Sequence, residues 1–113
     1  MLTARVGVAF DGNIRSLATG NQFLRRLIYR GGHSQLAVMS LAPGDEVSEG
    51  PHDAFDQVLI IVEGRGTVVL DGRVHGADKH DCIVVPAGSP HRIVNGADAD
   101  LKVFTIWSAR EHV

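Results

Sequence analysis

The sequence lacks the features that mark several classes of protein. It has one cysteine, Cys82, so no disulfide can form within the chain. The formal net charge is −2 and the basic residues are scattered, apart from Arg25 and Arg26, so no basic patch indicates nucleic-acid binding. No apolar run approaches the roughly 18 residues of a membrane helix, and the first residues lack the apolar segment of a signal peptide. These absences predict a cytoplasmic protein that binds neither nucleic acid nor membranes.

What the chain does contain is frequent turn residues. Thirteen glycines and four prolines separate short runs that are alternating or fully apolar, a pattern typical of an all-β sandwich or barrel. Phe23 to Tyr29 is also compatible with a helix, because Phe23 and Leu27 lie four residues apart. Glu46 to Phe55 shows no clean period. The predicted strands are Arg5 to Phe10, Asn13 to Ala18, Phe23 to Tyr29, Gln35 to Leu41, Gln57 to Val62, Thr67 to Leu70, Arg73 to His75, Ile83 to Val85, His91 to Asn95 and Leu101 to Trp107.

Two turns are strongly marked. Asp71 and Gly72, between two short runs, form the strongest hairpin signal in the chain. Proline cannot donate to a sheet ladder and glycine accepts turn dihedrals, so Pro86 to Pro90 predicts a turn between strands. This turn delivers His91 to the start of a strand with its side chain committed to one face, which makes His91 a candidate site residue. The alternative is a turn-edge histidine that only hydrogen-bonds the local backbone.

The residues around the second turn match a family motif. Pro86, Gly88, His91 and Asn95 occupy the corresponding places of Gly-x5-Pro-x-Gly-x2-His-x3-Asn, and His80 replaces the leading glycine. The chain therefore resembles the cupins, small β-barrels that carry this motif after an earlier one. The resemblance implies an all-β fold, the cupin double-stranded β-helix or jelly-roll barrel of short antiparallel strands.

The earlier motif, Gly-x5-His-x-His-x3 or 4-Glu-x6-Gly, is matched only in part. Gly44, His52 and Gly64 agree with it, whereas Gly50 stands at the first histidine and Gln57 at the glutamate. The resemblance spans residues 36–107. It divides the chain into N-terminal strands and turns at 1–34, the barrel at 35–107 and a tail at 108–113, within one domain overall.

The resemblance implies a mononuclear metal site at the barrel mouth, held by His52, Gln57 and His91. Imidazole nitrogens and an amide oxygen suit zinc or another divalent transition metal better than calcium or magnesium. None of these ligands carries a negative charge. The nearby carboxylates of Asp53 and Asp56 are each one residue away from a ligand position, so on a regular strand they face the other way. In a second interpretation the three residues hydrogen-bond one another and bind no metal.

Two kinds of function fit these residues. The first is a small-molecule-binding cupin that acts as a metal-dependent enzyme. The alternative is a non-catalytic small-ligand-binding protein or a dimeric scaffold without metal. The changes at Gly50 and Gln57 count against iron-dependent dioxygenases, which usually rely on several histidines and a carboxylate. The sequence leaves the enzyme question open, because a fold hosts many functions.

Further expectations concern assembly and single residues. Val58 to Val62 and Ile83 to Val85 are apolar on both faces, so a second layer or a second subunit must cover the outer face, and a homodimer is favoured. Arg25 is interpreted as a surface arginine on an edge strand; the alternative is an arginine in the barrel with an anionic partner. Cys82 is expected to be a buried thiol. The remaining histidines are expected in turns or at the surface: His33, His75, His80 and His112.

Overall fold

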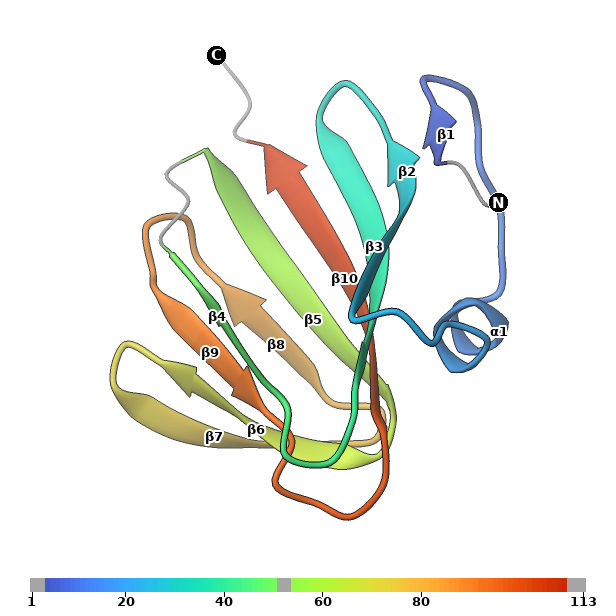
Figure 1. Cartoon of the computed structure of the whole chain (residues 1–113). Coiled ribbons are helices and arrows are strands. Elements are labelled where there is room, and N and C mark those ends of the chain that lie inside the picture. Colours follow the sequence, from blue (N-terminus) through green and yellow to red (C-terminus); the bar gives the residue numbers. More distant parts are fainter. Residues whose placement is uncertain (1–3, 51–53, 110–113) are drawn as a thin grey trace.

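Short strands make up most of the chain (Figure 1). The computed structural model describes residues 4–50 and 54–109. No helix within these ranges is long and apolar enough to cross a membrane. The elements are β1 (Arg5–Val6), α1 (Ile14–Thr19), β2 (Arg25–Arg30), β3 (Ser34–Leu41), β4 (Glu46–Glu49), β5 (Phe55–Glu63), β6 (Arg65–Leu70), β7 (Arg73–Asp78), β8 (Cys82–Val85), β9 (His91–Val94) and β10 (Leu101–Ala109).

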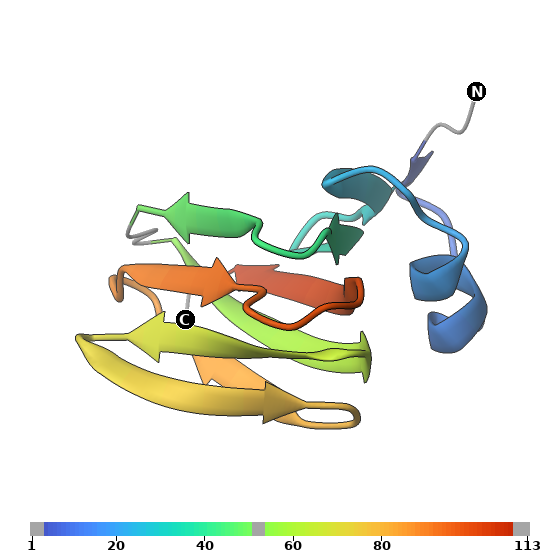
Figure 2. The same ribbon diagram turned by 60° about the horizontal axis from the view of Figure 1, so that its bottom comes forward.

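The strands form two sheets that face each other. One sheet has six strands in the order β1-β2-β3-β10-β5-β8, and the other has four in the order β4-β9-β6-β7. All pairs are antiparallel except β1 with β2. Figure 2 shows the layers from another side, with α1 outside the six-stranded sheet. The predicted all-β jelly-roll fold is confirmed, and β10 continues two residues beyond its predicted end at Trp107.

Both marked turns are where the sequence predicts them. Asp71 and Gly72 have φ angles of 51° and 78° and join β6 to β7, the left-handed pair that a tight hairpin needs. The segment from Pro86 to Pro90 joins β8 to β9, and Gly88 has a φ of 86°. His91 is the first residue of β9, as expected.

Apolar side chains from both sheets fill the space between them. Because side chains alternate along a strand, each strand contributes every second residue to this core. Ile61 and Val103 come from the six-stranded sheet, and Val68 and Ile93 from the four-stranded one. All four side chains are at most 1% exposed. This core joins the two sheets, and the buried polar residues Gln57 and His91 lie in the same interior.

The segment from Asn13 to Ala18 is a helix rather than the predicted strand. The Asn13 side chain accepts a hydrogen bond from the Ser16 backbone N–H, which caps α1 at its N-terminus. Ala18 is fully buried against Val38 and Phe104 on the outer face of the six-stranded sheet. The helix thus supplies part of the outer cover that the apolar strands require, a tertiary contact that local alternation does not reveal.

The far edge of that sheet is less covered. Val84 on β8 is 54% exposed, and Cys82 on the same face is exposed, so the prediction of a buried thiol was wrong. The reason is that β8 is the last strand of the sheet and turns only Ile83 and Val85 inward. The homodimer stays a prediction.

Candidate functional site

The candidate site lies at the barrel mouth, the end of the barrel where β4 ends and β5 and β9 begin. The register across the six-stranded sheet places Gln35, Trp107, Gln57 and Val85 in one row there. In the four-stranded sheet, Glu49 is directly paired with His91. The mouth is therefore built from two sheets, each contributing polar side chains to one inner face.

His91 is held inside the barrel. Its side chain is 1% exposed. Burial lowers the pKa of this imidazole; the neighbouring backbone of Ser89 raises it, and the positive charge of Arg25 lowers it further. The ring is therefore neutral at neutral pH and keeps a nitrogen lone pair. Within residues 4–50 and 54–109, neither ring nitrogen makes a hydrogen bond. The backbone of Ser89, two residues earlier, is near enough to raise the pKa of the ring, so a contact with the local backbone accompanies its position inside the barrel.

Gln57 faces the same interior. It is 2% exposed, and its Nε2 donates a hydrogen bond of 3.0 Å to Oγ1 of Thr105. This bond orients the amide and leaves Oε1 directed elsewhere, with no hydrogen-bond partner in the described part of the chain. Gln57 and His91 line one small gap of about 10 Å³, together with Trp107. That volume is close to what a single water-sized particle occupies.

The third predicted ligand, His52, lies outside the described residues. So does Asp53, whereas Asp56 is exposed and accepts a hydrogen bond from the Ala87 backbone N–H, facing away from the site as expected. His75 and His80 are at the surface, and His80 has a φ of 75° in its turn. No cluster of three or more histidine, cysteine or acidic side chains suited to a metal ion occurs in the described ranges.

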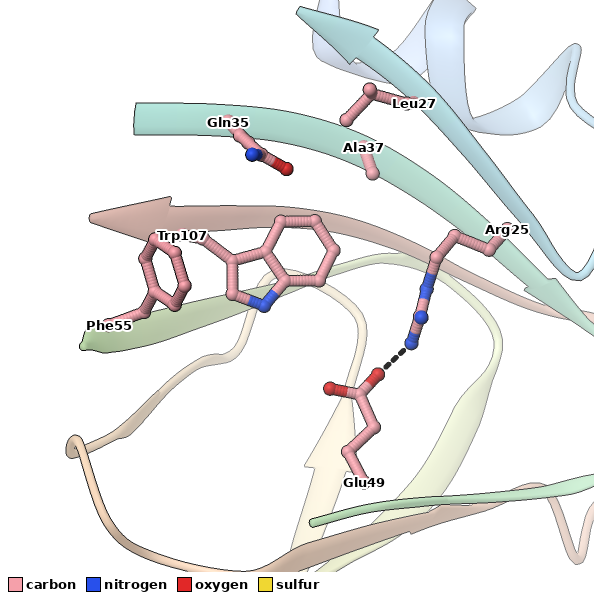
Figure 3. Close-up of a pocket in the computed structure, with 7 residues that line it drawn as sticks. All are labelled: Arg25, Leu27, Gln35, Ala37, Glu49, Phe55 and Trp107. Carbon is pink, nitrogen blue, oxygen red and sulfur yellow. Dashed lines mark hydrogen bonds and ion pairs between the residues drawn. The ribbon is translucent and has the colours of Figure 1, made fainter. Parts of the chain in front are cut away.

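Glu49 is a site residue that the sequence interpretation missed. Its side chain is 7% exposed and forms an ion pair with the guanidinium of Arg25 (Figure 3). Its Oε2 lies 3.3 Å from Nε2 of His91. The missed signal is short: Val47 and Glu49 alternate with the exposed Glu46 and Ser48, which is a period-two strand.

Arg25 is exposed, as interpreted, and it also has the anionic partner that the alternative interpretation named. Its guanidinium lies 5.6 Å from the ring centroid of Trp107 and pairs with Glu49. The side chain is 44% exposed, which places it at the rim of the mouth. Burial lowers the pKa of Arg25, although the group remains a cation at any ordinary pH. The ion pair joins Arg25 on β2 of the six-stranded sheet to Glu49 on β4 of the four-stranded sheet, which makes Arg25 part of the site.

A cavity opens beside these groups. Its volume is about 340 Å³, the size of a small-molecule site. Figure 3 shows the Trp107 indole and the Arg25–Glu49 pair on its walls. Trp107 and Phe55 also line the small gap at Gln57 and His91, so the two spaces adjoin. The full lining is Arg25, Leu27, Gln35, Ala37, Glu49, Phe55 and Trp107.

Comparison with known proteins places this arrangement in a family. BH2720 from Bacillus halodurans has a solved structure that superposes with a TM-score of 0.83 at 30% sequence identity, over 92% of this chain and 83% of that one. The protein L612 of Acanthamoeba polyphaga mimivirus is 35% identical over 105 residues, which are 88% of this chain and 65% of that protein.

Other relatives carry descriptive names. The acireductone dioxygenase of Parvibaculum lavamentivorans is 31% identical over 108 residues, or 84% of this chain and 58% of that protein. The chain thus spans about two thirds or less of the length of these curated relatives. The sequence model described as the Cupin domain matches residues 37–107. Together with the jelly-roll fold and the motif residues at the barrel mouth, this match shows that the chain belongs to the cupin family.

Proposed function

We propose that this cupin binds a small organic molecule at a mononuclear metal site in the barrel mouth. The observation that carries the proposal is a pair of buried polar atoms without hydrogen-bond partners among the described residues: Gln57 Oε1 and Nε2 of His91. An unpaired buried polar group costs roughly 1–3 kcal/mol, so such atoms gathered at one gap call for a bound species. His52, three residues after Glu49, completes the proposed ligands.

The residues present fit a divalent transition metal or zinc. A neutral imidazole and an amide oxygen are ligands of the borderline type that these ions accept. The gap of about 10 Å³ between Gln57 and His91 matches one bound ion or water. The Thr105 hydroxyl holds the Gln57 amide with its oxygen available, which is the role of an outer partner in a metal site. When bound, the metal supplies a Lewis acid that polarises an oxygen of the ligand.

The chain's own residues define what the ligand can be. The adjoining cavity of about 340 Å³ admits a small molecule rather than a polymer. Trp107 and Phe55 give it an apolar wall, while Arg25 and Gln35 present hydrogen-bond donors. We infer a compact ligand with oxygen groups at one end and an apolar body. The relatives named acireductone dioxygenase and TcmJ, a tetracenomycin polyketide synthase protein, are consistent with small organic substrates.

A non-catalytic binding protein is the second candidate. The ion pair between Arg25 and Glu49 favours it, because the positive charge of Arg25 already offsets the negative charge of Glu49 without a metal ion. In that case the apolar walls bind the ligand and the polar atoms of Gln57 and His91 bind water.

The deciding experiment measures metal content and metal binding. Purified protein is analysed for bound metal and titrated with Zn²⁺, Co²⁺, Ni²⁺, Mn²⁺ and Fe²⁺, for the unmodified chain and for His52→Ala, His91→Ala and His75→Ala. We expect one metal per chain, lost in the first two variants and retained in the third, because His75 is exposed on β7. The absence of saturable binding of every one of these ions to the unmodified chain would contradict the metal site and leave the non-catalytic alternative.

A further inference from the structure

Glu49 carries a negative charge in a place where charge is costly. Its side chain is 7% exposed, and it lies on β4 with its neighbours Ser48 and Glu46 facing solvent. A carboxylate withdrawn from water requires compensation by hydrogen bonds or an opposite charge. The two oxygens of Glu49 differ in this respect, and the difference indicates what the residue does.

One oxygen is compensated. Oε1 receives the hydrogen bond and ion pair from Arg25, whose guanidinium is itself held over Trp107. Arg25 therefore offers an opposite charge to the carboxylate and fixes its rotation, as a charged outer partner does for a ligand.

The other oxygen is not compensated. Oε2 is buried and, in the described part of the chain, makes no hydrogen bond. It lies 3.3 Å from Nε2 of His91, yet the imidazole is not aligned to donate to it, since Nε2 also lacks a hydrogen bond. Two buried polar atoms therefore face each other, and no hydrogen bond of suitable geometry joins them.

The separation of these two atoms has a chemical meaning. With metal–ligand bonds of about 2.1 Å, two ligands of one ion are about 3.0 Å apart at a right angle and about 3.4 Å apart at a tetrahedral angle. The observed 3.3 Å lies between these values. The strands also fix the pair, because Glu49 and His91 are direct cross-strand partners of β4 and β9 and both side chains point to the inner face.

We propose that Glu49 is the anionic ligand of the metal site, binding the ion through Oε2 beside Nε2 of His91 while Arg25 holds Oε1. This inference rests on the proposed metal-binding function. It explains how the site tolerates Gln57 in place of a glutamate and Gly50 in place of a histidine. The family motif has its carboxylate at the position of Gln57, on β5. In this chain the proposed carboxylate ligand is Glu49 on β4 of the other sheet, one residue before Gly50.

The test compares Glu49→Gln, Glu49→His and Glu46→Gln by titration calorimetry with Zn²⁺ and Co²⁺, with folding checked by circular dichroism. Loss of an outer partner costs about 10–100-fold in metal affinity, so we expect Glu49→Gln to weaken binding by at least about 100-fold. Glu46→Gln is the matched control, because Glu46 lies on the same strand but pairs with Arg92 at the surface, and its affinity should not change.

Glu49→His distinguishes a ligand from a partner of Arg25. Histidine can bind the metal but cannot form the ion pair, so we expect this variant to retain Co²⁺ with an altered visible absorption spectrum. Unchanged affinity in Glu49→Gln, or a Co²⁺ spectrum in Glu49→His identical to that of the unmodified chain, would overturn the proposal while leaving the metal site itself intact. If the unmodified chain binds no metal, the proposed function has failed first. Should Glu49→Gln not fold, the Co²⁺ spectrum of Glu49→His decides alone.

Discussion

Gln57 offers a direct way to separate the needs of the fold from the needs of the metal. The change Gln57→Glu keeps the size of the side chain and places a carboxyl where the family motif has one. In the metal-free protein this carboxyl is 2% exposed and is added next to a site that already holds Glu49. The Nε2 donor to Thr105 is also lost, although the hydroxyl can rotate to donate instead.

The cost can be bounded. A buried, uncompensated carboxylate costs about 3–5 kcal/mol, but taking up a proton at pH 7 limits the penalty to about 3.7 kcal/mol for a group with an ordinary pKa near 4.3. We therefore expect metal-free Gln57→Glu to lose about 2–4 kcal/mol of unfolding free energy. For a domain of this size the loss corresponds to about 8–16 °C in Tm.

Thermal unfolding without Zn²⁺ measures the loss of stability in Gln57→Glu, and unfolding with Zn²⁺ measures how much of it the ion restores. The ion should restore the lost stability, since ligand at 100 times its Kd contributes about 2.7 kcal/mol. Because the introduced carboxyl has a raised pKa when folded, the metal-free deficit should shrink as the pH falls from 7 to 5. The matched control is Gln35→Glu, in a half-buried wall of the cavity away from His91. A Gln57→Glu protein as stable as the parent without metal, or one that gains nothing from any divalent ion, would refute the reasoning.

Two further predictions concern pH and backbone. Burial lowers the pKa of His91, so as the pH falls the unfolded chain takes up this proton before the folded chain does, and the unfolding free energy of the metal-free protein should fall below about pH 6.5. In denaturant titrations, the unfolding free energy of His91→Gln should depend less on pH than that of the unmodified chain. An equal dependence on pH in both proteins would contradict the prediction. Gly64 has a φ of 84°, and a Cβ there would lie 2.4 Å from the Asp100 carbonyl oxygen, so Gly64→Ala should cost about 2–4 kcal/mol. Gly44→Ala, with a φ of 87° and open space, should cost about 1–2 kcal/mol, and equal losses in urea unfolding would exclude the clash.

The fold was predictable where local chemistry decides the structure. Asp71 and Gly72 require left-handed φ angles that few other pairs adopt, and the prolines around Gly88 end one strand and begin another. Such rules place His91 at a strand start without knowledge of its neighbours. The helix at Ile14–Thr19 escaped because its six residues gain their stability from packing on the sheet, which a local pattern does not contain.

The site was predictable only in part, because its composition depends on pairing between distant strands. Gln57 and His91 were predicted through motif spacing, and both are buried at the barrel mouth. Glu49 was not, since a glutamate in a polar stretch becomes significant only once β4 pairs with β9 in a register that turns it toward His91. The same holds for Arg25, whose place beside Glu49 follows from two strands 24 residues apart in the sequence.

The position of the site between two sheets has a mechanical consequence. Glu49 and His91 belong to the four-stranded sheet, whereas Gln57 and Trp107 belong to the six-stranded one. Any species that contacts both pairs links the two sheets at the barrel mouth. Binding there should slow the opening fluctuations that expose the amides of β4 and β9 to hydrogen exchange, and should have little effect on β7, which contributes no residue to either pair. A bound species would thus slow hydrogen exchange along whole strands, including amides that do not touch it.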